Sequence, residues 1–215
     1  LDELQPAFTE YATAKAKDFA AEADLTKPNP LEVNPLEQNA IVDWLESNPN
    51  NIWALNATCV NLIDQEKYLE AIPLLEKSIK LYPRQRGGSS PYGMLSLAHR
   101  ELGQADNELS VLEKWAAIED SATKLYERLM KIYADRKDWP SVERSAKRFF
   151  SANPLSPVSH RFMALKSQET GDKAASVRPL KRLLLLNPAD PVDLHVRLAS
   201  ALVAISPDEA IRHAL

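Results

Sequence analysis

Proline recurs at a regular interval along this sequence, each time at the end of an apolar stretch. The endings are Leu81-Tyr82-Pro83, Ala152-Asn153-Pro154 and Leu186-Asn187-Pro188. The last two lie 34 residues apart, and the first two lie 71 apart, which is close to twice that interval. Proline cannot donate the hydrogen bond that continues a helix, so it ends the helix before it. The interval therefore indicates a repeated unit of two helices joined by a turn.

The residues between these prolines have helical spacing. In residues 52–83, Leu55, Cys59 and Leu62 form one stripe, and Ala71, Leu75 and Ser78 form a second. Spacings of three, four and seven residues are those of a buried helical face. Only five of the 215 residues are glycine, which also favours a helical chain. We expect the fifteen prolines at helix boundaries or first turns, because an interior proline costs about 3 kcal/mol.

These units resemble the tetratricopeptide repeat. The resemblance implies an all-α fold, an α-solenoid of antiparallel helix pairs with a right-handed superhelix and an N-terminal helical cap. We expect an array over residues 52–215, made of repeats at 52–85, 89–122, 123–156 and 157–190 and a truncated repeat at 191–215. The repeat at 89–122 lacks the final proline. The alternative is an unrelated helical bundle whose periodicity arose by chance.

The N-terminal part fits the repeat less well. Residues 1–27 form one expected segment, with an amphipathic helix at 3–24 that uses Leu4, Phe8, Tyr11 and Phe19. Residues 28–51 form a second, with a proline-rich stretch and a capping helix at 36–47. The run from Ala7 to Leu25 is similar to the segment that joins a peptidase-MA-like (gluzincin) domain to C-terminal repeats in some bacterial proteins. That similarity implies the non-catalytic part of a metallopeptidase-like protein. Because the chain starts at Leu, we expect a fragment or a processed form.

The sequence shows no motif for catalysis. The histidines at 99, 160, 195 and 213 have no His-Glu-x-x-His neighbours, so we expect no metal site. No phosphate loop, dinucleotide fingerprint or nucleophile elbow is present, and we expect no cofactor and no catalytic residue. Cys59 has the position of a buried, inert thiol. An enzyme with an unfamiliar kind of site is the remaining alternative.

Charge and hydropathy narrow the class of partner. The net charge of −4 argues against nucleic acid. No apolar run approaches eighteen residues, so we expect no membrane span. A protein or peptide is the partner that remains, and nothing in the sequence indicates a cellular compartment.

The resemblance also implies where such a partner binds. In the family, the first helices of the repeats line a concave groove, and the exposed apolar residues there mark an interaction site. The expected groove residues are Trp53, Asn56, Val60, Ile63, Met94, Leu97, Lys124, Arg128, Lys131, Arg161, Phe162 and Leu165. The alternative is a groove covered by the chain's own N-terminal helix. Lys124 and Arg128 match part of the family's carboxylate clamp, but the other three clamp positions do not match, so we expect no clamp.

The charges are unevenly distributed. Residues 1–51 have a balance of −7, whereas residues 144–182 have a balance of +7. The expected repeats place two basic triplets at matching positions of the second helix, and stacking should align them. The triplets are Arg144, Lys147 and Arg148, and Arg178, Lys181 and Arg182. They form either a dock for an acidic partner or a solvated surface.

Besides an enzyme with an unfamiliar kind of site, two functions remain open. The first is a binding scaffold that holds a peptide or partner domain in the groove. The second is a structural, oligomerisation or substrate-positioning module of a larger metallopeptidase-like protein. We also expect partly uncovered apolar faces over residues 194–205, and therefore either self-association through this end or a longer native chain.

Overall fold

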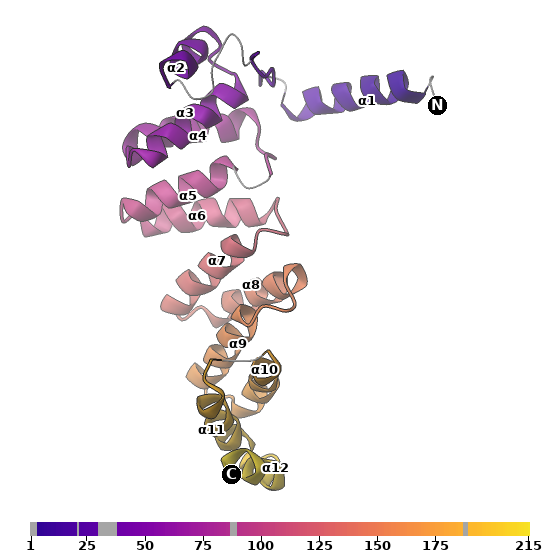
Figure 1. Cartoon of the computed structure of the whole chain (residues 1–215), viewed down its shortest axis with the longest axis vertical. Coiled ribbons are helices and arrows are strands. Elements are labelled where there is room, and N and C mark those ends of the chain that lie inside the picture. Colours follow the sequence, from indigo (N-terminus) through magenta and orange to yellow (C-terminus); the bar gives the residue numbers. More distant parts are fainter. Residues whose placement is uncertain (1–3, 21, 30–37, 87–89, 187–188) are drawn as a thin grey trace. The chain divides into compact units, whose positions relative to one another are not determined.

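The computed structural model describes residues 4–20, 22–29, 38–86, 90–186 and 189–215. These residues form twelve helices and no strand. The chain divides into two compact units, Leu1–Ile118 and Glu119–Leu215. Figure 1 labels the helices in chain order.

The first unit contains two single helices and two helix pairs. Its helices are α1 (Leu4–Phe19), α2 (Gln38–Ser47), α3 (Ile52–Asp64), α4 (Tyr68–Leu81), α5 (Pro91–Glu101) and α6 (Ala105–Ala116). From α2 onward, each helix packs against the next, and α3 also contacts α5. The pairs α3–α4 and α5–α6 can be followed in Figure 1.

The second unit contains three helix pairs. Its helices are α7 (Thr123–Asp135), α8 (Trp139–Ala152), α9 (Val158–Glu169), α10 (Lys173–Leu185), α11 (Pro191–Leu202) and α12 (Pro207–Ala214). Each helix packs against the next, and α7 also contacts α9. Each of the five ranges expected as repeats contains one helix pair.

The turns inside four of these pairs share one backbone conformation. A residue with positive φ follows the first helix each time: Glu66 (58°), Gly103 (70°), Lys137 (58°) and Gly171 (73°). In three of the turns, the next amide donates to a carbonyl five residues earlier, as a Schellman cap requires. The bond from Asp138 N to Tyr133 O is 2.9 Å long. The repeated unit is therefore encoded in its turns as well as in its apolar stripes.

Helix starts follow from local capping. Asp138, Asp172 and Asp190 each accept a hydrogen bond from the backbone amide three residues later. The expectation that every proline lies at a boundary or in a first turn is wrong at two positions, because Pro73 lies inside α4 and Pro179 inside α10. Tertiary packing outweighs the local cost, since neighbouring helices cover both elements.

The first helix is shorter than the sequence predicted. It ends at Phe19 rather than Asp24, because Asp24 joins Asn51 in an isolated parallel bridge. Asp24 N donates to Asn50 O and Ile52 N donates to Asp24 O, which holds this segment in an extended conformation. Of the four residues expected on the apolar face, Phe8 and Tyr11 are exposed. The side chains of Leu4 and Phe19, and residues 36–37 of the expected capping helix, lie outside the described residues.

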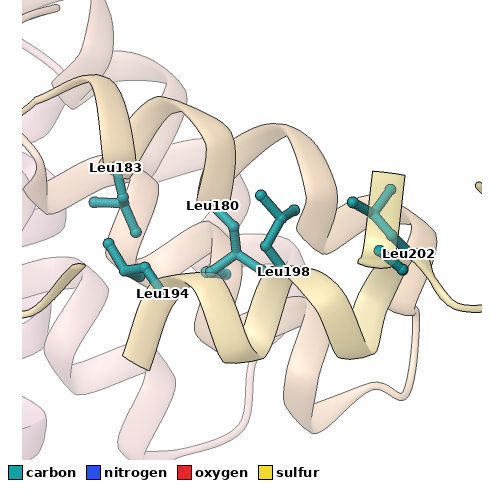
Figure 2. Packing of buried hydrophobic residues seen from close by; sticks show 7 residues of the cluster. Leu180, Leu183, Leu194, Leu198 and Leu202 are labelled. Carbon is teal, nitrogen blue, oxygen red and sulfur yellow. The ribbon is translucent and has the colours of Figure 1, made fainter. Parts of the chain in front are cut away.

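Leucine side chains fill the core of the second unit between α10 and α11. Figure 2 shows Leu183 and Leu180 of α10 facing Leu194 and Leu198 of α11. Leu202 joins the same cluster together with Ala210 of α12. The expected uncovered face over residues 194–205 is therefore partly wrong, because α10 and α12 bury its leucines. Val196, Val203 and Ile205 are the members of that range that stay well exposed among the large apolar residues.

Candidate functional site

Six of the expected groove residues lie on α3 and α5, and most of them take part in packing. Ile63 and Met94 pack against a buried core cluster of the first unit. The Asn56 side chain accepts a hydrogen bond of 2.9 Å from the buried Ser78 Oγ of α4. The six are Trp53, Asn56, Val60, Ile63, Met94 and Leu97, and only Val60 is exposed. This face is therefore partly accessible to a partner.

The other six lie on α7 and α9 of the second unit. On α7, Lys124 and Lys131 are exposed, and Arg128 is half-buried. On α9, Arg161 is exposed, and Phe162 and Leu165 are half-buried. Of these six, Arg161 and Leu165 line the groove that lies between α9 and α11.

This groove begins where α9 and α11 separate. Among the described helices, α7 contacts α9, whereas α9 and α11 make no comparable contact. The space between them holds about 680 Å³. Its floor is apolar and includes Ala164 and Leu183, which also belong to the core cluster.

A second hollow continues the groove along the same two helices. It holds about 550 Å³ and is lined by Leu180, Ser176 and Val196, among others. Both parts share four lining residues: Ala164, Gln168, Asp193 and Arg197. The two hollows therefore form one groove. Polar side chains cross the middle of this groove from α11 to α9, and we call this contact the crossing.

The crossing is a side-chain bridge. Arg197 Nη2 donates to Gln168 Oε1 at 3.3 Å, and Arg197 Nη1 lies 3.5 Å from Asp193 Oδ2. All three groups are at least partly exposed. With Arg161 and Asp190 also in the lining, positive and negative side chains balance. The wall can thus both donate and accept hydrogen bonds above an apolar floor.

Comparison with known proteins identifies the architecture. YrrB, a tetratricopeptide-repeat protein, aligns with a TM-score of 0.63 at 10% identity over 82% of this chain and 90% of its own. A tetratricopeptide-repeat protein from Parabacteroides merdae gives 0.57 at 14% identity over 82% and 69%. MamA from Desulfovibrio magneticus gives 0.54 at 13% identity over 76% and 89%. No protein-family model matches the chain, and no curated protein does.

This chain has the tetratricopeptide-repeat fold. At these identities the likeness establishes the fold alone. The tetratricopeptide-like helix pairs agree with the all-α expectation and with the resemblance on which it rested. The similarity of residues 7–25 to a peptidase-MA-like linker receives no support from these structures and stays a prediction.

The expected groove residues include one wall of the hollow between α9 and α11 and not the other. They occupy the same positions of every first helix, and these positions lie on one side of each helix. A groove between two first helices needs opposite sides: α9 contributes Arg161, Leu165 and Gln168, whereas α11 contributes Asp193 and Arg197. The α11 residues Asp193 and Arg197 are predictable from the sequence if the first helices of adjacent repeats are taken to face each other.

The sequence also missed a histidine pair. His195 Nδ1 of α11 lies 2.8 Å from His213 Nδ1 of α12, and Glu209 lies 3.9 Å from His213 Nε2. Nothing in the sequence around His195 indicated this contact, because its partner is eighteen residues away. Elsewhere, His99 is buried and bonds Gln104 at 2.7 Å, as expected of a packing residue.

The described parts of the chain contain no group of three or more His, Cys, Asp or Glu side chains able to hold a metal ion. Cys59 is fully buried, and burial raises the pKa of its thiol to about 12, so it stays protonated. Within the same residues, no helix is long and apolar enough to cross a membrane.

Proposed function

We propose that this chain is a non-catalytic binding scaffold and that the groove between α9 and α11 holds an extended peptide segment of a partner protein. The observation that carries this proposal is the composition of the groove. An apolar floor suits one or two aliphatic or aromatic side chains, and the balanced polar wall suits a peptide backbone, which has both donors and acceptors.

The fold supports the same class of ligand. YrrB is described as a tetratricopeptide-repeat protein with an unusual peptide-binding site.

Selection from a library of random dodecapeptides displayed on phage tests the proposal. Enriched peptides are resynthesised, and their affinity is measured for the parent chain and for L165S/Q168A. We expect a shared apolar anchor among the peptides and a loss of about tenfold or more in the variant, because one apolar contact and one hydrogen bond are removed. The matched control is L155S, since Leu155 is 79% exposed and lies outside the groove.

Two results would overturn the proposal. One is a selection that enriches no peptide on the folded chain. The other is a set of peptides that bind the parent, L165S/Q168A and L155S equally well, which places their site elsewhere.

A structural role is the second candidate, and exposed apolar side chains near the last helix pair favour it. They are Val192, Val196, Val203, Ile205, Ile211 and Leu215, each more than half exposed. Such side chains suit contact with a second copy of the chain. Sedimentation of the parent and of V203E/I211E tests this: a parent dimer lost in the variant supports it, and a monomeric parent at high concentration rejects it.

A further inference from the structure

A separate hollow lies on the other side of α9, between α8, α9 and α10. It holds about 400 Å³. Ser159 and Met163 line it, whereas Arg161, Leu165 and Gln168 line the peptide groove. At 100° per residue these two sets lie on nearly opposite faces of α9. The two hollows can therefore be occupied independently.

The floor of this hollow is apolar. Ala146, Met163 and Pro179 contribute to it. Phe150 of α8 is 43% exposed, and its ring meets His160 of α9 edge to face with centroids 5.5 Å apart. An exposed phenyl ring fixed by an aromatic neighbour is a surface on which another apolar side chain can pack.

The rim of this hollow is basic, and two of its three cations form no ion pair with a described residue. Arg178 and Arg182 lie one turn apart on α10, and neither is engaged in an ion pair with a described residue. Lys147 completes the rim from α8 and pairs with Glu143 at 2.8 Å. Burial, followed by the charges of Arg182 and Arg178, lowers the pKa of His160. The charges of the two guanidinium groups are therefore not neutralised by an ion pair with a described residue.

Two polar groups at the hollow also lack their usual partners. Ser159 is 2% exposed, and its Oγ forms no hydrogen bond with a described residue. A buried hydroxyl without a partner destabilises the fold, so a bound acceptor would relieve that cost. Pro179 has no N–H, so the carbonyl of Ala175, one turn earlier, lacks its helical donor.

The six basic residues expected to form one band differ in their contacts. Lys147, Arg178 and Arg182 meet at this hollow. The other three serve the chain itself: Arg144 donates to Ser141 Oγ at 2.8 Å, Lys181 pairs with Glu209 at 2.6 Å, and Arg148 bonds the Tyr126 hydroxyl. The charge available to a partner is concentrated at the hollow.

We propose that this hollow binds an acidic segment of a partner protein, in which Arg178 and Arg182 hold a carboxylate and an adjacent apolar side chain packs against Phe150. Two guanidinium groups on neighbouring turns can each form a charge-assisted hydrogen bond to carboxylate oxygens. The apolar floor favours a ligand with an aliphatic or aromatic group beside its charge over a ligand that has charge alone, because burial of the apolar group adds to the affinity. The overall charge of −4 makes a polynucleotide a poorer match than a protein.

The test measures binding of a fluorescent peptide to the full chain by anisotropy. The probe is an acetylated peptide with the core Asp-Glu-Phe-Asp-Glu, and two matched peptides replace either Phe by Ala or all acids by their amides. We expect both changes to weaken binding, the amide peptide by about tenfold or more because charged hydrogen bonds are lost. Binding should also weaken from 0.1 to 1 M salt, as the Debye length falls from about 10 Å to about 3 Å.

Variants then locate the site. R178Q/R182Q should bind the probe at least about tenfold more weakly, because it removes both charged donors. K124Q/K131Q removes the same charge from exposed positions of α7 and should stay within about twofold, since distant charges are screened. S159A should leave the free chain as stable as the parent or more stable, and it should lower the affinity for the probe peptide. The groove variant L165S/Q168A should not affect this probe, which separates this proposal from the previous one.

Three results would reject the proposal. The first is no binding of the Asp-Glu-Phe-Asp-Glu peptide. The second is an equal loss of affinity for the peptide in R178Q/R182Q and K124Q/K131Q, which means that the peptide responds to the overall charge and not to this hollow. The third is competition by inorganic phosphate or by an oligothymidine at concentrations below that of the peptide, which identifies the hollow as a general anion or nucleic-acid site.

Discussion

Asn51 donates from Nδ2 to the Asp24 carboxylate at 2.7 Å and so ties the segment after α1 to the start of α3. The same nitrogen donates to Thr26 O at 2.7 Å, and the Asn51 side-chain oxygen caps α3 by accepting from Ala54 N at 2.9 Å. Asn51 is fully buried. One side chain thus satisfies a helix end and fixes a connection between residues 27 positions apart.

Replacing this side chain should destabilise the first unit. We expect N51A to lower the free energy of unfolding by about 1–3 kcal/mol, since it removes a helix cap and leaves buried groups without partners. Urea denaturation measures the change. N50A is the matched control, because Asn50 joins the contact through its backbone carbonyl. Equal stability of N51A and N50A would show that the contact contributes nothing.

Glu143 links α8 to α9, and its contribution should depend on pH. Hydrogen bonds from Lys147 and then Lys166 lower the pKa of its carboxyl from 4.5 to about 2. The stabilisation is therefore complete above the unfolded value and is lost as pH falls from 4.5 towards 2. We expect E143Q to lose up to about 1 kcal/mol at pH 7, because the pair is partly exposed, and nothing near pH 2.

Urea denaturation of E143Q, the parent and the control E127Q at both pH values checks this expectation. Glu127 is exposed on α7 and serves as a carboxylate outside this contact. A deficit of E143Q that is equally large at pH 2 contradicts the ion-pair account, since the carboxylate would then not be the stabilising form.

The left-handed turn residues offer a test of the repeated turn. Lys137 has a φ of 58°, which disfavours residues with a Cβ. We expect K137G to raise stability by about 0.5–1 kcal/mol, after the larger entropy of glycine in the unfolded chain is deducted. G103A should lower stability. The cause is the backbone conformation and not a steric clash, because a Cβ at Gly103 meets no atom within 4 Å. Thermal melts measure both variants, and a less stable K137G contradicts the argument.

Ala71 tests the packing of a helix pair. It is fully buried in the cluster between α3, α4 and α5. A71L should cost about 1–3 kcal/mol, because a larger side chain overfills that cluster. The matched substitution A105L, at an exposed position of α6, should change the melting temperature little. An unchanged melting temperature in A71L means that the cluster can expand.

The sequence predicted the helix pairs because proline, glycine and apolar stripes act locally. Pro154 and the stripe ending at Phe149 are enough to delimit α8, and Gly171 marks a turn by its own conformational freedom. The end of α1 was not predictable in this way. Residues up to Asp24 have helical spacing, but the bridge to Asn51 competes with the helix, and that contact joins residues 27 positions apart in the sequence.

The candidate site was predictable only in part, for a related reason. Arg161 and Leu165 were found from their positions on one helix, whereas Arg197 and Asp193 enter the groove only because α11 separates from α9. The basic residues of α8 and α10 were predicted from their repeated positions in the sequence, but the acidic residues that pair with them were not. Glu209 pairs with Lys181 from another helix, and no spacing rule connects them.

The measurement that tests the central claim most directly is amide hydrogen exchange of the full chain with and without a peptide selected on it. If the groove between α9 and α11 is the binding site, protection should increase along residues 158–169 and 191–202, with no change along α3 and α5. Protection confined to α3 and α5, or to the hollow beside Phe150, would contradict the claim that this groove holds the peptide.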